Sequence, residues 1–496
     1  MSTGHRLCHR GFAKTLNRNR GCPVAMMVIE VPAELKGFGE AVVEAMAEVK
    51  RTIGRAAGGK ALGYDEVECA IADCTAEIER ACHHAVLAAL DIDRPAVEIA
   101  GKRYARVGRG EAPYYSMAGP VPVERTLYRE CGQRNAKTVD TVSLRAGVVA
   151  DGWLPRTARA MAHEVQKATS REAEASAREQ KRLPYSRSSF ERVAHAVGAL
   201  YVTAHVDIED ALVEAYEVPA EARSISISLD RVSVPMEEPR ARPVGRPKKG
   251  AAKRPVARNF RMAYCGTVTM HDAAGGALHT IRYGRMPQGD AEGLCAGMAG
   301  DVLALLRKKP GLKVQLLCDG APEMWNLLKA WFTEELLGTE VHELVDFCHV
   351  IEKLGKAAQV IHGDQAAAVV QRWRLALLNR ASAAREIVAE LRESGMEYAG
   401  GSGEQHVHDG ITYLDNHDAR LNFANARRLG LPIGSGNVEA TCKSLFNVRM
   451  KRGGSRWKEE SGERIVQLRA LALSDRWGDA IANTLHLLRT PVRLAA

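Results

Sequence analysis

The chain has 496 residues, of which 46% are hydrophobic and 26% charged, and its formal net charge is +9. This length predicts roughly two to four domains, and the composition is ordinary for a soluble globular protein. No apolar run reaches the roughly 18–20 residues of a membrane span, so the sequence excludes a membrane-spanning helix, and its basic balance favours a polyanionic partner.

Eleven cysteines are scattered through the chain without a C-x-x-C pair. This pattern predicts reduced cysteines in a cytoplasmic protein rather than a zinc site. Residues 1–29 contain five basic residues and no acid. A transit peptide has that composition, but the segment lacks an amphipathic pattern, so we expect a disordered tail or a spurious upstream segment.

The N-terminal region is predicted to be mainly helical. Residues 30–100 place apolar side chains at three- and four-residue spacing, as in Val67, Ile71, Cys74 and Ile78, which is typical of packed amphipathic helices. Within residues 101–160 the period shortens in RYARVG, PVPVERTLYREC and TVDTVSLRAGVV. These segments predict short strands in a small β-containing element.

Residues 161–205 are predicted to form a helix-turn-helix. Thr169–Glu172 and Ser188–Glu191 each have the pattern of a capping box at the start of a helix. Arg187 and Arg192 would then lie on the open face of the second helix, where they could meet DNA. The alternative is an ordinary helical hairpin with a solvated polar face.

The spacing of apolar residues changes at Ser224, where SISISLDRVSVPM alternates between apolar and polar residues. The alternation predicts a strand with Ile225 and Ile227 on one face and Asp230 on the other, at the strand's end. A basic loop follows at residues 237–258. Its GRPKKG run resembles an AT-hook, which would place Arg246, Lys248 and Lys249 in the minor groove of DNA; the alternative is a solvated loop.

Further strands are predicted at residues 262–271, 277–286, 313–318 and 340–347, with helices between the last three. The order β-β-β-α-β-α-β over residues 222–350 is that of an RNase H-like core, an α/β fold with a mixed five-stranded sheet. Residues 351–432 then read as an all-helical insertion.

Residues 433–496 are predicted to return to the core as C-terminal helices that carry Glu439. This glutamate follows the glycine turn Gly434-Ser435-Gly436, whose glycines would let the backbone come close to a metal or a phosphate. Asp319 follows the 313–318 strand, so Asp230 and Asp319 are expected to lie next to each other. Three such carboxylates suit a two-metal phosphoryl-transfer site that holds Mg²⁺ or Mn²⁺.

From about Ser224 to Trp477 the sequence resembles the DDE transposases of bacterial insertion sequences, most closely the Kra-type group and more loosely Mutator-like enzymes. The segments that carry the resemblance are SLDRVSVPM, LLCDGAPEMW, DFCHVIEKL, YLDNHDARL, LPIGSGNVEATCK and RMKRGGSRW. It implies that Asp230, Asp319 and Glu439 bind two Mg²⁺ or Mn²⁺ ions. It also matches Asp346 and His349 to a D-x-x-H signature, while Arg231 stands where a glycine is expected.

The resemblance further implies metal-dependent DNA end cleavage and strand transfer by a homo-oligomer in the bacterial cytoplasm, associated with the nucleoid. The partner would be double-stranded DNA, as transposon ends with inverted repeats and as target. His349 would contact the scissile phosphate, or be a structural histidine. Basic side chains after the third carboxylate would contact the DNA backbone: Lys443, Arg449, Lys451, Arg452 and Arg456.

Two other functions fit the same features. One is a DNA-binding regulator that uses the helix pair and the basic loop, with a catalytically inactive RNase H-like core. The other is a structure-specific DNA nuclease on the same fold, which would cut branched DNA without regard to transposon ends.

Overall fold

The structure is a computed structural model that describes residues 30–58, 63–133, 135–237, 258–395 and 404–495. The expected tail and most of the basic loop, with Arg246, Lys248 and Lys249, lie outside these residues. The chain divides into two compact units, residues 1–197 with 485–496 and residues 198–484. Among the described residues, no helix is long and apolar enough to cross a membrane.

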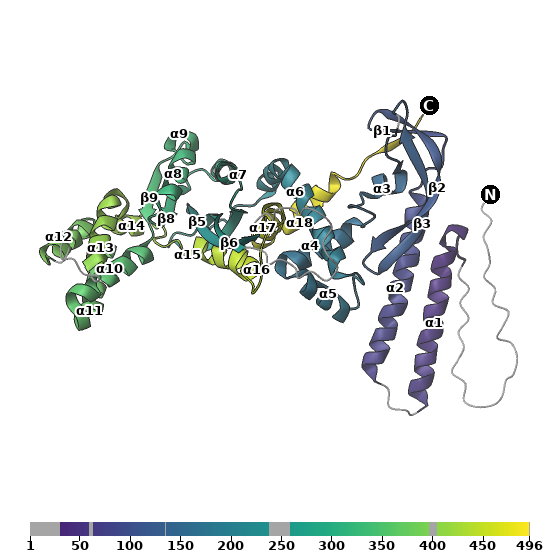
Figure 1. Cartoon of the computed structure of the whole chain (residues 1–496), viewed down its shortest axis with the longest axis horizontal. Helices are drawn as coiled ribbons and strands as arrows, with labels where there is room; N and C mark the ends of the chain where they lie inside the picture. The colour runs from purple at the N-terminus through teal and green to yellow at the C-terminus, as the bar shows by residue number, and fades with distance from the viewer. Residues whose placement is uncertain (1–29, 59–62, 134, 238–257, 396–403, 496) are drawn as a thin grey trace, which may run out of the picture. The chain divides into compact units, whose positions relative to one another are not determined.

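The first unit combines a helical hairpin with an antiparallel sheet. Helices α1 (Lys36–Ala57) and α2 (Tyr64–Ala89) form the hairpin, preceded by a 3₁₀ turn at Ala33–Leu35, and α2 packs against β3 (Figure 1). The sheet has the strand order β10-β1-β2-β3-β4. Its strands are β1 (Ala96–Ile99), β2 (Lys102–Ser116), β3 (Gly119–Glu130), β4 (Val139–Asp140) and β10 (Val492–Leu494).

This sheet is larger than the predicted element of short strands. Strands β2 and β3 form one long hairpin paired from Tyr104↔Glu130 to Ser116↔Gly119. Of the strand predicted in TVDTVSLRAGVV only the two residues of β4 form, because the side chain of Asp140 accepts a hydrogen bond from the Ser143 N–H and starts helix α3 (Thr141–Ala146).

The end of the chain was also assigned wrongly. Residues 433–496 were expected to pack entirely on the core, but β10 adds an edge strand to the sheet of the first unit, with Val97 opposite Leu494. Residues 459–486 form two helices, α17 (Glu459–Leu473) and α18 (Trp477–His486). The break occurs at Asp475, whose φ of 57° is incompatible with a continuing helix.

Three helices follow the first sheet: α4 (Pro155–Lys167), α5 (Ser170–Glu179) and α6 (Arg187–Ala215). The capping box at Thr169 and Glu172 is confirmed. Helix α6 begins before Ser188, since the Ser186 carbonyl already accepts from the Phe190 N–H. It continues to Ala215, so the predicted boundary at residue 205 is wrong, and the division between the two units falls within this helix.

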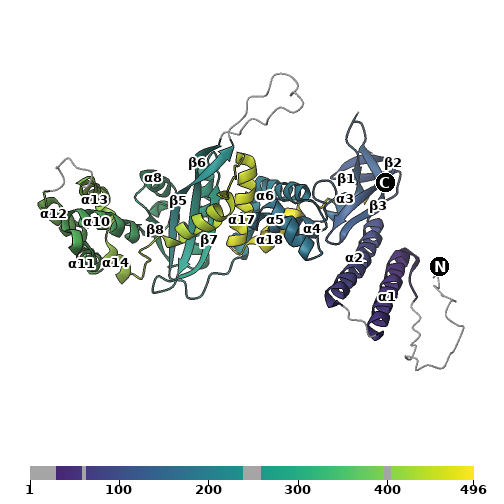
Figure 2. The same cartoon turned by 60° about the horizontal axis from the view of Figure 1, so that its bottom comes forward.

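The second unit is built on a mixed sheet of order β7-β6-β5-β8-β9 (Figure 2). Strands β5, β6 and β7 are antiparallel neighbours, whereas β8 runs parallel to β5 and β9 parallel to β8. The RNase H-like prediction is therefore confirmed. The elements are β5 (Ser224–Glu237), β6 (Arg258–His271), β7 (Ala277–Arg285), α7 (Ala291–Lys308), β8 (Lys313–Cys318), α8 (Pro322–Trp331), α9 (Glu334–Leu337) and β9 (Val341–Val345).

The two faces of this sheet are covered by different helices. Ile225 and Ile227 pack in one cluster with residues of α7, whereas Val232 and Val234 pack in another with Val466 of α17. Figure 2 shows α17 beside β7. By alternation Asp230 lies on the face that α17 covers. It does not end the strand as predicted, because β5 continues seven residues beyond it to Glu237 while pairing with β6.

The insertion is helical, and its core is continuous with that of the sheet face that α7 covers. Figure 1 shows its helices gathered beyond the β8–β9 edge: α10 (Phe347–His362), α11 (Ala366–Asn379), α12 (Ala383–Glu393), α13 (Glu404–Asn416) and α14 (Phe423–Arg428). The chain returns through α15 (Gly436–Thr441), a π-helical turn at Cys442–Asn447 and α16 (Val448–Met450).

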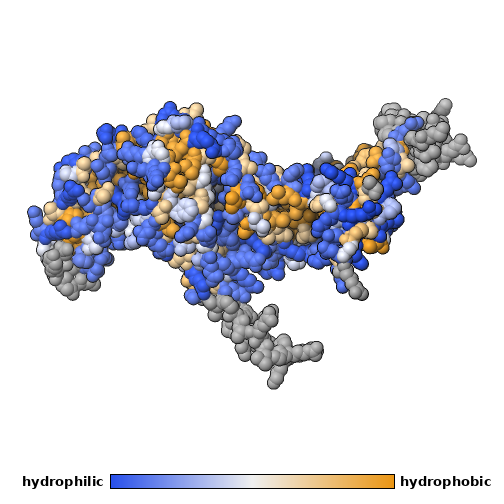
Figure 3. Space-filling model, turned by 90° about the horizontal axis from the view of Figure 1, so that it is seen from above, coloured by the Kyte–Doolittle hydropathy of each residue, from blue (hydrophilic) through white to orange (hydrophobic). Residues whose placement is uncertain are grey.

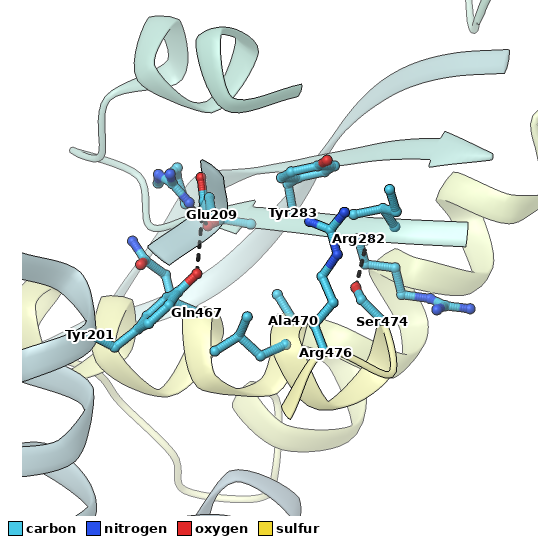
Figure 4. A pocket seen from close by; sticks show the side chains of 12 residues that line it. Tyr201, Glu209, Arg282, Tyr283, Gln467, Ala470, Ser474 and Arg476 are labelled. Carbon is cyan, nitrogen blue, oxygen red and sulfur yellow. Dashed lines mark hydrogen bonds between the residues drawn. The ribbon is translucent and has the colours of Figure 1, made fainter. Parts of the chain in front are cut away.

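A buried polar cluster fastens α6 and α17 to β7 within the second unit (Figure 4). Both carboxylate oxygens of Asp301 accept hydrogen bonds from Arg476, each at 2.9 Å, and Asp301 also accepts from Tyr283. Tyr201 donates to Glu209 at 3.1 Å, and burial raises the pKa of the Glu209 carboxyl. The cluster is largely buried and its charged members pair with one another, so we assign it a structural role.

We expect Asp301→Ala to lower the free energy of unfolding by about 3–5 kcal/mol, because it leaves the Arg476 guanidinium buried without its counter-ion. Asp301 is 2% exposed and Arg476 8% exposed. Urea denaturation of the full chain measures the change. The double variant Asp301→Leu/Arg476→Met removes both charges and should recover most of the loss; a single variant as stable as wild type would contradict this assignment.

Candidate active site

Asp230 is held against the segment that carries Glu439. One of its carboxylate oxygens accepts from the Arg231 N–H at 2.6 Å and the other accepts from the Cys442 thiol at 3.3 Å. Burial raises the pKa of Asp230, and the charges of Asp319 and Glu439 raise it further, while the two hydrogen bonds oppose the rise. The three carboxylates are therefore electrostatic neighbours.

Asp319 follows β8 in a turn that is fixed from several directions. Its carboxylate accepts from the Ala321 N–H at 3.0 Å, and its carbonyl accepts from the Trp325 indole N–H at 2.6 Å. The Cys318 thiol donates to the Leu229 carbonyl at 3.0 Å. This contact joins the end of β8 to β5 directly beside Asp230.

The helical insertion supports the same turn. A methyl group added to Gly320 would overlap the Tyr413 ring and lie 2.9 Å from His417 Nε2. His417 is 8% exposed, and burial lowers the pKa of its imidazole. The insertion thus contributes side chains from α13 and its C-terminal end to the packing of the Asp319 turn.

We expect Gly320→Ala to lower the free energy of unfolding by about 1–3 kcal/mol through overpacking, and to reduce catalysis by displacing Asp319. Chemical denaturation measures the first effect. Gly300→Ala is the matched control, because Gly300 lies in α7 and a methyl group there meets nothing within 4 Å. A Gly320 variant no less stable than the Gly300 variant would contradict the close packing.

Glu439 is positioned through Asp346, which is 1% exposed at the end of β9. One carboxylate oxygen of Asp346 accepts from the His349 backbone N–H at 2.9 Å and caps α10. The other accepts from the Ser435 N–H and from the Ser435 hydroxyl, the latter at 2.8 Å. Asp346 therefore ties the start of α15 to the end of β9.

His349 lies beside the third carboxylate. Its Nε2 is 3.5 Å from Glu439 Oε1, and the two side chains are 38% and 42% exposed. Asp346 bonds the backbone of His349 and not its ring, so the D-x-x-H pattern here combines a buried structural aspartate with a partly exposed histidine.

The turn that contains Gly434 and Gly436 does not depend on glycine conformations, and the close approach of its backbone to a metal or a phosphate stays a prediction. Neither Gly434 nor Gly436 has a positive φ. A methyl group on Gly434 would lie at an ordinary 3.7 Å from Asp346 Oδ2, and one on Gly436 would meet nothing within 4 Å. The hydrogen bonds of Ser435, rather than glycine conformations, fix this turn.

Arg231, which stands where the family pattern has glycine, forms an ion pair with Glu323 of α8. Glu323 also accepts a hydrogen bond from the Tyr264 hydroxyl at 3.1 Å. Arg231 therefore extends away from the face that carries Asp230.

The side chains predicted to contact DNA differ in their exposure to solvent. Arg449 is 6% exposed, and its guanidinium lies 4.9 Å from the centre of the Trp457 ring, so its predicted contact with DNA is wrong. The segment itself docks on the end of β5, where the Trp457 N–H donates to the Pro235 carbonyl at 3.0 Å. Exposed or partly exposed side chains remain at Lys443, Lys451, Arg452 and Arg456.

In the first unit, Arg187 and Arg192 are exposed, and Arg192 pairs with Asp151 at 3.7 Å.

The carboxylates of Asp230, Asp319 and Glu439 suit a hard divalent cation, because carboxylate oxygens are the ligands that Mg²⁺ and Mn²⁺ prefer. Within the part of the chain that the structure describes, no three His, Cys, Asp or Glu side chains converge closely enough to hold one ion. A two-ion site does not require this, since each ion takes only part of the carboxylate set. Burial first, and then the charges of Asp319 and Glu439, raise the pKa of Asp230, and a bound divalent cation would stabilise its ionised form.

No family model matches the sequence, and it matches no curated protein sequence. Among solved structures, the chain is similar to one in the Drosophila P element transposase strand transfer complex, with a TM-score of 0.21 and 13% sequence identity. The match covers 67% of this chain and 79% of that chain. At this score and identity the likeness carries no conclusion about the present chain.

Several residues of the site were missed from the sequence. Cys442 follows Glu439 by three positions and Ser435 precedes it by four, so both could have been found by their place on the same segment. Tyr413 lies in YLDNHDARL, a segment that carries the family resemblance but has no predicted role. Its contact with Gly320 depends on how the insertion folds back, and no local pattern predicts that.

Proposed function

We propose that the second unit catalyses metal-dependent cleavage of double-stranded DNA at transposon ends and transfers the freed 3′-hydroxyl to target DNA, as in DDE transposases. The observation that supports this most is the mixed sheet of RNase H-like order, in which Asp230 lies on β5, Asp319 follows the neighbouring strand β8, and the segment that carries Glu439 contacts Asp230 through Cys442. When bound there, two Mg²⁺ or Mn²⁺ ions would supply activation of the attacking oxygen and stabilisation of the leaving oxygen.

The chain's own residues would have distinct tasks in this reaction. Asp230, Asp319 and Glu439 would hold the ions. Gly320 would keep Asp319 in place, and Asp346 would keep Glu439 in place. His349 would donate a hydrogen bond from Nε2 to the scissile phosphate, or keep Glu439 oriented before DNA binds. No covalent enzyme intermediate is required, because the attacking group is an oxygen of water or of DNA.

Lys443, Lys451, Arg452 and Arg456 would bind DNA phosphates beside the carboxylates. We expect the double variant Lys451→Ala/Arg456→Ala to weaken binding to all duplex sequences alike, and to reduce the slope of log Kd against log salt by about 0.9 for each lost phosphate contact. Fluorescence anisotropy over a salt series measures this. Arg427→Ala/Arg428→Ala, which removes two exposed cations from α14 of the insertion, is the charge-matched control and should leave the slope unchanged.

The reaction joins two transposon ends, so the working enzyme would be a homo-oligomer on DNA. A gel assay tests the proposal by offering duplexes with the inverted repeats that flank the coding region, and generic branched junctions, each with Mg²⁺ or Mn²⁺. End-specific nicking supports the transposase. Cutting of junctions regardless of sequence would replace it with a nuclease, and end binding without nicking in either metal would replace it with a DNA-binding regulator.

A further inference from the structure

Three buried thiols lie beside the carboxylates of Asp230 and Asp319. Cys442 is 6% exposed, and Cys265 and Cys318 are both 0% exposed. Figure 3 shows a face of the molecule on which hydrophilic residues predominate, with hydrophobic patches between them. The thiols belong instead to the packed interior, where Cys318 Sγ lies 3.7 Å from Asp319 Oδ1 and Cys442 Sγ lies 3.3 Å from Asp230 Oδ2.

Two unequal donors orient the Asp230 carboxylate. Oδ1 accepts from the Arg231 backbone N–H at 2.6 Å, and Oδ2 accepts from the Cys442 thiol. A backbone N–H is a strong hydrogen-bond donor, whereas a thiol is a weak one. The thiol therefore fixes the direction of Oδ2 in the metal-free protein, and this oxygen loses less than Oδ1 when it turns toward a cation.

Cys265 supports the Cys442 thiol from the neighbouring strand. Cys265 pairs with Asp230 across β6 and β5, so their side chains lie on the same face of the sheet. Cys265 and Cys442 also pack in one core cluster. The contact with Cys265 first, and then burial, raise the pKa of the Cys442 thiol, which therefore stays a hydrogen-bond donor.

The contact between Cys442 and Asp230 also joins two distant segments of the chain. Cys442 begins the π-helical turn that follows α15, three positions after Glu439, whereas Asp230 lies within β5. A hydrogen bond between these segments limits how far the turn that carries Glu439 can move from Asp230. Cys442 is thus placed to set both the direction of one carboxylate and the position of another.

We propose that Cys442 is a positioning residue of the metal site, where its thiol orients Asp230 Oδ2, holds the Glu439 segment against β5 and so raises the affinity for Mg²⁺ or Mn²⁺. This inference rests on the proposed function. Cys442 acts through Asp230 and not as a ligand, because these cations prefer oxygen to sulfur.

Isothermal titration calorimetry of the full chain with Mn²⁺, without DNA, tests the role of Cys442. Cys442→Val keeps the apolar contacts and removes the donor, so the Kd for Mn²⁺ should rise by about 10–100-fold, as for other outer-shell partners of metal ligands. Cys442→Ser keeps a donor and should recover most of the loss. Cys295→Val is the control, because Cys295 is 0% exposed in α7, on the opposite face of the sheet, and its Kd should equal that of wild type. Thermal melting in EDTA checks that each variant is folded.

A Mn²⁺ titration of DNA cleavage separates positioning from structural damage. The cleavage rate of Cys442→Val should approach that of wild type at saturating Mn²⁺, because the variant binds the ions more weakly but keeps all three carboxylates. An unchanged Kd in Cys442→Val, a Cys442→Ser that binds as weakly as Cys442→Val, or a loss of cleavage that no Mn²⁺ concentration restores would overturn the role of Cys442 and leave the proposed function standing. A wild type that binds no Mn²⁺ would overturn the proposed function and this inference together.

Discussion

Asp230→Asn is expected to raise the thermal stability of the chain in EDTA while reducing metal-dependent DNA cleavage by on the order of 10³-fold or more. Burial, and then the charges of Asp319 and Glu439, raise the pKa of Asp230. An acid whose pKa is higher in the folded state binds its proton more tightly when folded. Its ionised form therefore opposes folding at neutral pH, and this penalty disappears as the pH falls below the unfolded pKa.

Asparagine keeps the shape of the side chain and removes the charge, so the penalty should vanish at all pH values. Differential scanning fluorimetry in EDTA measures the stability, and Asp364→Asn, an exposed acid of the insertion, is the control. Saturating Mn²⁺ should then stabilise wild type, by about 2.7 kcal/mol at 100 times its Kd, and stabilise Asp230→Asn less. A variant that is less stable in EDTA, or that still cleaves DNA, would contradict the role given to Asp230.

Asp346→Ala should lower the free energy of unfolding by roughly 3–5 kcal/mol, because two buried donors and one partly buried donor lose a charged acceptor. Those donors are the His349 N–H, the Ser435 N–H and the Ser435 hydroxyl. The same change should release the start of α15 and displace Glu439, so cleavage should fall even where the protein is fully folded.

Two milder variants separate these effects. Ser435→Ala removes one of the three hydrogen bonds and should lower the free energy of unfolding by about 1 kcal/mol. The loss for Asp346→Asn should lie between those for Ser435→Ala and Asp346→Ala. Urea denaturation ranks the three variants. If Asp346→Ala were as stable as wild type but inactive, Asp346 would be a catalytic residue rather than the positioning residue assigned to it here.

The sheet of the second unit was predictable because its strands are local patterns. The alternation in SISISLDRVSVPM defines β5 and the face of Asp230, and the short apolar run before Asp319 defines β8. The order of strands and helices then leaves few possible topologies. The capping box at Thr169 was predictable for the same reason, since all of its hydrogen bonds lie within four residues.

One error concerns a contact that spans a long stretch of sequence. Nothing near Val492 indicates that this segment pairs with β1, almost 400 positions earlier. Arg449 reads as one of a run of surface cations, and only its packing on Trp457 removes it from the surface. The turn at Gly434-Ser435-Gly436 is fixed by hydrogen bonds between Ser435 and Asp346, and no local rule predicts this pairing of distant segments.

The central claim is that Asp230, Asp319 and Glu439 form one metal-dependent catalytic site. The most direct measurement compares cleavage of a duplex carrying the flanking inverted repeat by wild type, Asp319→Ala and Glu439→Ala, each shown to be folded, across a Mg²⁺ titration. The account predicts nicking that requires Mg²⁺ and leaves a 3′-hydroxyl in wild type, and no nicking by either variant at any Mg²⁺ concentration. Cleavage by either variant at the wild-type rate, or wild-type cleavage that persists in EDTA, would contradict it.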